Sequence, residues 1–205
     1  TLPTTGTFTA PYYVGTNKPV TVAAITLTGA DSGNYTLTQP SVTASITAKN
    51  LTVTGTTGNN KVYDGGTSAT VNTTSSTLVG NLDGPNVVLV KTGATGVFTL
   101  NGNVGPAKTI QVSGFTISGS SAFNYTLTQP TTTANITPKP LTVTGITAND
   151  KPYDATTLAT LDKTSAALSG VETVDVGSVV LDTTLAAGTF TPNGNAGVGK
   201  TVQIS

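Results

Sequence analysis

The chain has 205 residues, nine lysines, nine acidic residues and no formal net charge, and it contains no His, Cys, Met, Trp or Arg. It therefore lacks the commonest general base and metal ligand, the thiol nucleophile, the zinc thiolates and the bidentate phosphate clamp. There is no basic patch to neutralise phosphates, and no apolar run reaches the roughly 20 residues that span a bilayer. We predict a non-catalytic protein with no cofactor, no metal, no nucleic-acid partner and no membrane insertion.

The composition indicates an all-β fold. Thr, Gly, Ser, Asn, Val and Ala make up most of the chain, and the β-branched Thr and Val suit a pleated surface better than a helix. Good helix formers are scarce, since Met and Arg are missing and Glu172 is the single Glu. Short apolar–polar alternations bounded by Gly, Asn, Pro and Ser recur along the chain, which is typical of short strands joined by tight turns.

An internal repeat organises the chain. The heptapeptide that begins at Asn34 recurs identically at Asn124, 90 positions further on, and the pentapeptide that begins at Leu51 recurs at Leu141 with the same offset. Such self-similarity predicts tandem structural units. We divide the chain into the C-terminal half of a first repeat (1–47), a complete second repeat (48–137) and the N-terminal part of a third (138–205).

The third copy is slightly longer than the second. Phe98 and Lys108 recur as Phe190 and Lys200, at an offset of 92 in place of 90. We therefore expect a two-residue insertion in a loop between residues 170 and 187.

In the complete repeat, the alternation predicts seven to nine short strands in a two-layer structure. Leu51 and Val53 share one face, with Thr52 and Thr54 on the other. The segment 62–66 is expected to end a strand in a tight turn, because Asp-Gly and Gly-Gly supply positive φ angles. In chain order, strands are expected at 51–54, near 62, at 69–71, 78–79, 87–90, 97–100, 108–118 and 125–127, with a loop at 101–106.

The segment 108–118 changes phase. Ile110 and Val112 share one face, whereas Phe115 and Ile117 share the other. A change of phase inside one apparent strand predicts a bulge or a crossing between two sheets. The small residues at 113–114 suit such a bend.

The junctions between repeats are short. Pro138 and Pro140 bracket Lys139, and proline forbids helix and pushes the preceding residue into extended conformations. Ala48–Asn50 occupies the corresponding place at the start of the second repeat. Three-residue joints leave little freedom between modules, so we expect an elongated, rather stiff rod.

Several motifs in fixed order resemble those of the YDG-type (MBG-like) repeat module. These motifs are Lys-Val-Tyr-Asp-Gly at 61–65, the opening at 51–55, the segment 119–129 and the closing Ala-Asn-Ile-Thr-Pro-Lys at 134–139. The resemblance covers the whole chain. Such modules form long arrays in very large bacterial filamentous-haemagglutinin-like adhesins that are exported by two-partner secretion. The resemblance therefore implies an extracellular or cell-surface location, and it leaves both a β-grasp-like topology and an immunoglobulin-like sandwich open.

The recurring Lys-x-Tyr-Asp motif supplies the candidate site residues. Beside a turn, Tyr at the edge of the core with a Lys–Asp surface pair is more often structural than a ligand site, and we interpret it so. Ala155 replaces the expected Gly in the third copy and tolerates positive φ poorly, so that turn is expected to differ in type or to be strained. The motif residues are Lys61, Tyr63, Asp64, Lys151, Tyr153 and Asp154.

An internal covalent cross-link is a sharper alternative for the recurring residues. Lys61 or Lys108 with Asn124, or a Thr with Gln129, are the residue types that bacterial stalk modules join across strands. Such chemistry requires the pair to be buried beside an acid that relays the proton, and acids are scarce in this chain.

The sequence therefore favours structural stalk or spacer repeats of a secreted bacterial cell-surface adhesin or filament. The partners expected are neighbouring repeats of the same chain, with glycan or host protein bound by other domains. Two alternatives stay open. The repeats themselves bind glycan or host matrix protein, for which Tyr12-Tyr13 is the candidate aromatic cluster, or the chain is a subunit of an extracellular fibre completed by strand exchange.

Overall fold

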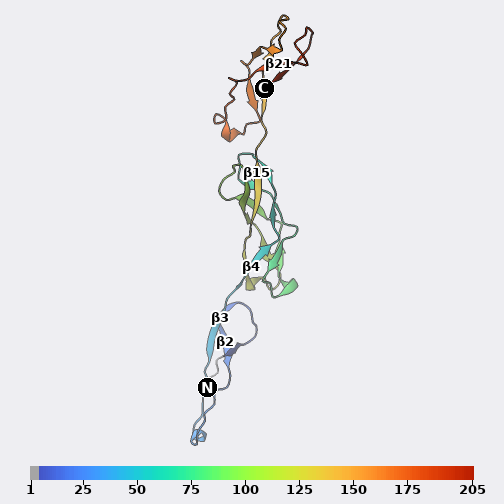
Figure 1. Cartoon of the computed structure of the whole chain (residues 1–205). Helices are drawn as coiled ribbons and strands as arrows, with labels where there is room; N and C mark the ends of the chain where they lie inside the picture. The colour runs from blue at the N-terminus through green and yellow to red at the C-terminus, as the bar shows by residue number, and fades with distance from the viewer. Residues whose placement is uncertain (1–4) are drawn as a thin grey trace. The chain divides into compact units, whose positions relative to one another are not determined.

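The protein is described by a computed structural model, which covers residues 5–205. Over that range the structure consists of short strands, and the helices are four 3-10 turns of three residues each (Figure 1). The predicted all-β fold is confirmed. None of the helices in residues 5–205 is long and apolar enough to cross a membrane.

The chain forms two compact units that interleave along the sequence. The first unit comprises residues up to 59, 69–97 and 109–133, and the second comprises 60–68, 98–108 and 134–205. The long strands β12 (Gly105–Ser113) and β15 (Thr131–Thr137) contribute residues to both units. We describe each unit by itself.

The first unit contains two three-stranded sheets. In one sheet, β2 (Gly15–Val22) pairs antiparallel with β1 (Gly6–Phe8) and with β3 (Val42–Ile46). In the other, β4 (Lys49–Thr54) lies between β14 (Tyr125–Thr128) and β9 (Thr77–Val79), parallel to the first and antiparallel to the second. Its further elements are η1 (Ser32–Asn34), β5 (Thr57–Gly58), β8 (Val71–Asn72), η2 (Gly84–Asn86), β10 (Val88–Val90), β11 (Thr95–Phe98, whose last residue belongs to the second unit), β13 (Thr116–Ser118) and η3 (Ala122–Asn124).

The core of the first unit follows the predicted alternation. Along β4, Leu51 and Val53 are buried while Thr52 and Thr54 are exposed, as expected. Leu51, Val87 and Tyr125 form a buried cluster, and each fully buried large apolar side chain contributes about 1.5–3 kcal/mol to stability. Leu78, Ile117 and Leu127 pack against this cluster.

The change of phase near residue 114 is a crossing between two sheets. The strand β12 belongs to a five-stranded sheet of order β6-β15-β12-β11-β7, whereas β13 pairs antiparallel with β10 in a separate two-stranded sheet. Gly114 lies between β12 and β13 with φ of 87°, and Ile110, Val112 and Phe115 are buried on the two sides of the bend. The predicted crossing is confirmed.

The second unit contains the tyrosine-containing turn of the second repeat and most of the third repeat. The strand β6 (Lys61–Val62) pairs in parallel with the end of β15, with Lys61 opposite Ile136. Phe98, Ala134 and Ile136 are its buried apolar residues. The other elements are β7 (Ser68–Ala69, shared with the first unit), β16 (Thr142–Thr144), β17 (Thr147–Ala148), β18 (Leu158–Ala159), β19 (Leu161–Asp162), β20 (Ala167–Ser169), η4 (Thr173–Asp175), β21 (Gly188–Thr191) and β22 (Thr201–Ile204).

The second repeat has more and shorter strands than predicted. Twelve strands, β4 to β15, lie between Lys49 and Thr137, and β5 to β8 have two residues each. The sequence predicted seven to nine strands. The number is higher because Gly and Asn interrupt the hydrogen-bonded ladders more often than the apolar pattern indicates. In the third repeat, the region predicted to hold the insertion contains no strand between η4 and β21, only a bridge between Val176 and Val179.

Candidate functional site

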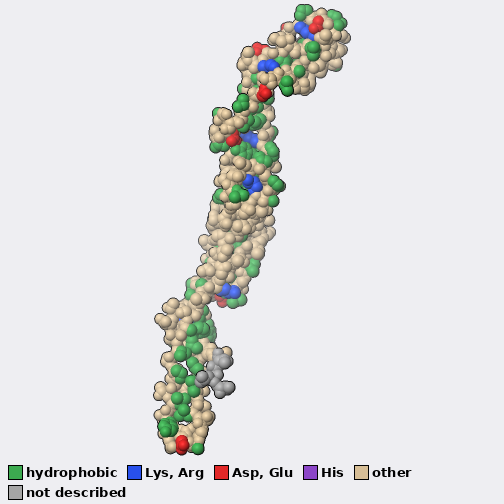
Figure 2. All heavy atoms as spheres, turned by 60° about the vertical axis from the view of Figure 1, so that its left-hand side comes forward, with side chains coloured by type: hydrophobic (Ala, Val, Ile, Leu, Met, Phe, Trp, Pro, Cys, Tyr) green, Lys and Arg blue, Asp and Glu red, His purple; other side chains and the backbone are tan. Residues whose placement is uncertain are grey.

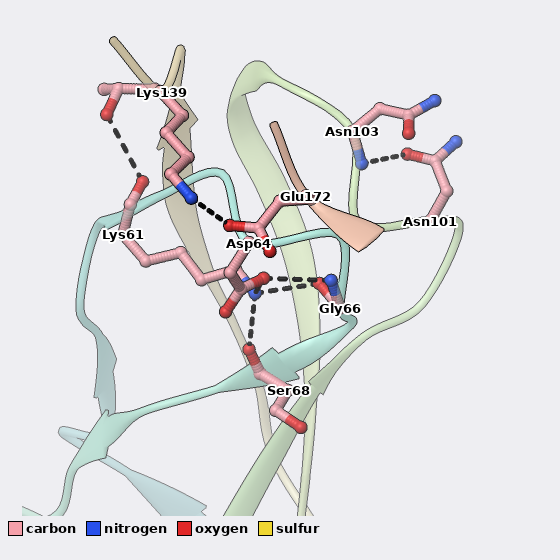
Figure 3. A network of polar contacts seen from close by, with 9 residues as sticks. Lys61, Asp64, Gly66, Ser68, Asn101, Asn103, Lys139 and Glu172 are labelled. Carbon is pink, nitrogen blue, oxygen red and sulfur yellow. Dashed lines mark hydrogen bonds and ion pairs between the residues drawn. The ribbon is translucent and has the colours of Figure 1, made fainter. Parts of the chain in front are cut away.

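A lysine organises the tyrosine-containing turn of the second repeat. We call residues 61–66 and their counterparts 151–156 the Lys–Asp turns. Lys61 Nζ donates to Asp64 Oδ1 at 2.7 Å, to the Gly66 carbonyl at 2.8 Å and to the Ser68 carbonyl at 3.0 Å (Figure 3). An ammonium group has three N–H donors, and here each of them has an acceptor.

The same turn is closed from the acid side. Asp64 Oδ1 also accepts the Gly66 N–H at 2.9 Å, which makes an Asx-type turn. Lys61 Nζ lies 5.5 Å from the ring centroid of the buried Phe98, within the range of a cation–π contact. The Lys61 side chain is 17% exposed and the Asp64 side chain 54%, so the lysine is shielded from solvent while its carboxylate partner lies at the surface.

The third repeat builds the same arrangement. Lys151 Nζ donates to Asp154 Oδ1 at 2.7 Å and to the Thr156 carbonyl at 3.1 Å, and the Thr156 hydroxyl is the third acceptor at 2.8 Å. Its ammonium lies 5.6 Å from the Phe190 ring centroid. The Lys, the Asp and the ring are thus kept, while the third acceptor changes from a carbonyl to a hydroxyl.

Ala155 does not change the type of the turn. Its φ is 60°, close to the 74° of Gly65 at the equivalent position. An L-residue in this left-handed region costs about 1–2 kcal/mol. Of the two predicted outcomes, a different turn type is wrong and backbone strain is what the structure has.

The lysines also determine the acidity of their partners. The hydrogen bond from Lys61 is the main cause that lowers the pKa of Asp64, assisted by the Gly66 N–H. The hydrogen bond from Lys151, with those from Thr156, lowers the pKa of Asp154 to about 2. Both carboxylates are therefore held in the charged form that the turns require.

We expect the Lys–Asp turns to lose stability in acid. Because the folded pKa of each Asp is lowered, its contribution is full above the unfolded value of about 3.9 and is lost as pH falls through about 2 for Asp154. Urea unfolding at pH 6 and at pH 2.5 measures this. Asp154→Asn should narrow the difference between the two pH values, and an unchanged difference would contradict the assignment.

A second recurring lysine, Lys108, lies in β12 and binds the loop that precedes this strand. Lys108 Nζ donates to Asn101 Oδ1 at 2.7 Å, and Asn101 Oδ1 also accepts the Asn103 N–H at 3.1 Å (Figure 3). In the third repeat, Lys200 Nζ binds Asn193 Oδ1 at 3.0 Å and the Asn195 carbonyl at 2.8 Å. The recurrence of these lysines was visible in the sequence, but the carbonyl and amide acceptors that they hold were not.

The first repeat uses an aromatic ring in this place. Lys18 Nζ lies 4.1 Å from the ring centroid of Tyr13, and the Tyr13 ring makes an edge contact with Phe123 at 5.6 Å. Tyr13 therefore has ring contacts within the chain although it is 44% exposed, while Tyr12 is 74% exposed.

The two motif tyrosines have different surroundings. Tyr63 is half-buried beside Asp175, and a hydrogen bond with that carboxylate is the main cause that raises the pKa of Tyr63. Tyr153 is 65% exposed. The equivalence of the two residues in sequence does not extend to their contacts.

The cross-link candidates have other partners in the structure. Lys61 and Lys108 donate to Asp64 and Asn101 as described, and Asn124 Oδ1 accepts the Val14 N–H at 2.9 Å. These contacts do not test whether a covalent bond joins the residues, so the cross-link stays a prediction.

Gln129 completes the hydrogen bonding at the crossing. Its Oε1 accepts the Phe115 N–H at 3.1 Å and its Nε2 donates to the Phe115 carbonyl at 2.8 Å. Gln39 makes the same pair of bonds with Ile25 at 3.0 and 2.7 Å. The side-chain amide thus takes the place of a neighbouring strand residue where the chain leaves one sheet for the other.

Charged side chains are sparse on the face of the molecule shown in Figure 2, where uncharged polar groups, backbone and scattered apolar residues dominate. In the described residues 5–205, no group of three or more acidic side chains is close enough to hold a metal ion. The site is therefore a set of lysine-held turns and an amide-bridged crossing.

Comparison with known proteins identifies these motifs. A family model described as "YDG domain" matches the chain in three segments, residues 1–44, 47–134 and 137–205. A search of curated proteins and a search of solved structures each found no significant match.

Proposed function

This chain belongs to the YDG domain family, and on that premise we propose that its repeats are non-catalytic, load-bearing spacers of a bacterial protein at the cell surface. In this role the repeats project a distal binding domain of an adhesin or filament and carry tension along the chain. Neighbouring repeats are their partners, and glycans or host proteins are bound elsewhere.

The parallel pairing of β4 with β14 carries this proposal. The two strands pair over four residues, from Lys49 opposite Tyr125 to Thr52 opposite Thr128. Hydroxyl groups of Thr126 and Thr128 add bonds to Asn50 Oδ1 at 3.2 and 2.9 Å. The strand β4 opens the second repeat and β14 leads into its last strand, so tension along the chain pulls them in opposite directions along their common axis. The hydrogen bonds of the ladder are then loaded together.

Pulling on the chain by its two ends tests the proposal. The second repeat should unfold in a discrete event, and Asn50→Ala should lower the force, because it removes the acceptor of both hydroxyl bonds. Asn72→Ala is the matched control, since Asn72, at the end of β8, accepts the N–H of its near neighbour Thr74 and has no side-chain hydrogen bond to β4 or β14 among residues 5–205. Extension without a discrete event, or equal effects of the two variants, would contradict a load-bearing role.

Strand exchange between copies is a second candidate, favoured by one contrast between repeats. Tyr125 is 8% exposed, whereas its counterpart Tyr35 is 71% exposed. Within residues 5–205 the segment around Tyr35 has no paired strand, whereas β14 is paired with β4. In the third repeat, a hollow of about 670 Å³ is lined by Val143, Leu185 and Ile204. Sedimentation over a range of concentrations decides: a mass that rises with concentration supports exchange, and a constant monomer mass rules it out.

A further inference from the structure

The Lys–Asp turn of the second repeat contacts a loop of the third. A Cβ placed on Gly65 would lie 2.6 Å from Val174 Cγ2 and 3.8 Å from Glu172 Cβ. The bare backbone of the turn is therefore in direct contact with the segment 172–175, which ends in η4. Glycine suits this position for two reasons: it has no Cβ to block the close approach of Val174, and it tolerates the φ of 74°.

Polar contacts flank this apolar contact on both sides. Lys139, from the junction between the repeats, donates to Glu172 Oε1 at 2.5 Å, and Figure 3 shows this pair next to the Lys61–Asp64 bonds. The side chains of Lys139 and Glu172 are 33% and 24% exposed. On the other side, Asp175 is the main cause that raises the pKa of the Tyr63 hydroxyl, through a side-chain hydrogen bond.

We propose that the Lys–Asp turn is a socket for the repeat that follows it, and that the loop it accepts carries a branched apolar residue between two acids, as Glu172-Thr-Val-Asp175 does. Gly65 leaves room for Val174, and Lys139 binds the first of the two acids, Glu172. The inference deepens the proposed mechanical role, because a socket of this kind couples consecutive repeats.

The socket also discriminates between repeats. In the second repeat, Leu82 and Gly84 stand where the third has Glu172 and Val174. Leu82 is 77% exposed, and Asp83 accepts the hydroxyl of Tyr125 at 2.7 Å within its own repeat. A loop with this sequence offers neither the carboxylate for the junction lysine nor the branched side chain. Consecutive repeats are therefore matched and not freely interchangeable.

An engineered disulfide tests the contact directly. The chain has no Cys, and the 3.8 Å between a Cβ on Gly65 and Glu172 Cβ matches the usual Cβ separation of about 3.8 Å in disulfides. Because a Cβ at position 65 would lie 2.6 Å from Val174 Cγ2, the variant also carries Val174→Ala, which makes room for the new side chain. The triple variant Gly65→Cys, Glu172→Cys and Val174→Ala should lose two hydrogens on mild oxidation and give one cross-linked peptide from within a single chain. The two variants with a single Cys are the controls. A triple variant that stays reduced, or links only between chains, would overturn the proposal.

Hydrogen exchange gives a second measurement that does not depend on a cysteine at the strained position 65. The Tyr63 N–H is bonded to the Thr137 carbonyl at 2.9 Å. Val174→Ala should speed its exchange about fivefold by removing the side chain packed on the turn, and should leave the Val53 amide in β4 unchanged. Equal rates in the variant and the parent would overturn the socket. A load test that failed while the disulfide formed would remove the mechanical role and leave the socket standing.

Discussion

Gln129→Ala is expected to destabilise the second repeat by about 3 kcal/mol. The substitution leaves both the N–H and the carbonyl of Phe115 without their partner, and Phe115 is 2% exposed, so water does not readily replace the amide. An unsatisfied buried backbone group costs about 1–3 kcal/mol, and two are created here. Urea unfolding gives the loss of stability, and exchange of the Phe115 amide assigns it to the crossing.

Gln39→Ala is the matched control for this prediction. It removes the same two bonds from Ile25, but Ile25 is only half-buried, so water can hydrate the freed groups and the loss should stay below about 1 kcal/mol. Gln129→Glu keeps an acceptor for the Phe115 N–H but places a carboxylate against the Phe115 carbonyl. Its loss of stability should therefore equal or exceed that of the Ala variant. If the Gln39 and Gln129 variants lost equal stability, burial of the crossing would not be the cause.

The sequence predicts the β class and the inward faces because these depend on local pattern. The two-residue period of a strand is enough to predict the inward face along 51–54. The same period, applied separately before and after residue 114, is enough to predict the change of phase between Val112 and Phe115. Both were confirmed. Strand number was underestimated, because the ends of ladders depend on which partner strand is alongside, and that partner is distant in sequence.

The roles of the recurring polar residues were less accessible. Recurrence marked Gln129, Lys61 and Lys108 as important, but a residue's recurrence does not reveal its partner. The partners of Gln129 are the backbone atoms of Phe115, and those of Lys61 include two carbonyls; backbone groups carry no signal in the sequence. The contact of Gly65 with Val174 lies between repeats, so it follows from neither repeat alone.

The glycine at the crossing should be the least replaceable residue of the second repeat. A Cβ on Gly114 would lie 1.9 Å from the Gly93 carbonyl oxygen, and backbone on both sides is held in ladders, β12 in one sheet and β13 in the other. The φ of 87° adds the penalty of a left-handed L-residue, about 1–2 kcal/mol. Gly114→Ala therefore forces a backbone shift as well as strain, and we expect a loss of about 4 kcal/mol.

Gly84→Ala separates the two contributions, because Gly84 also has a positive φ, 56°, but a Cβ there meets nothing within 4 Å. Its loss should be about 1 kcal/mol, the conformational part alone. Urea unfolding of both variants measures the difference, which is the cost of opening the approach between residues 93 and 114. Equal losses of stability would mean that the backbone at residues 93 and 114 moves apart at little cost. The bend between the two sheets would then depend on Gln129 more than on the close backbone contact.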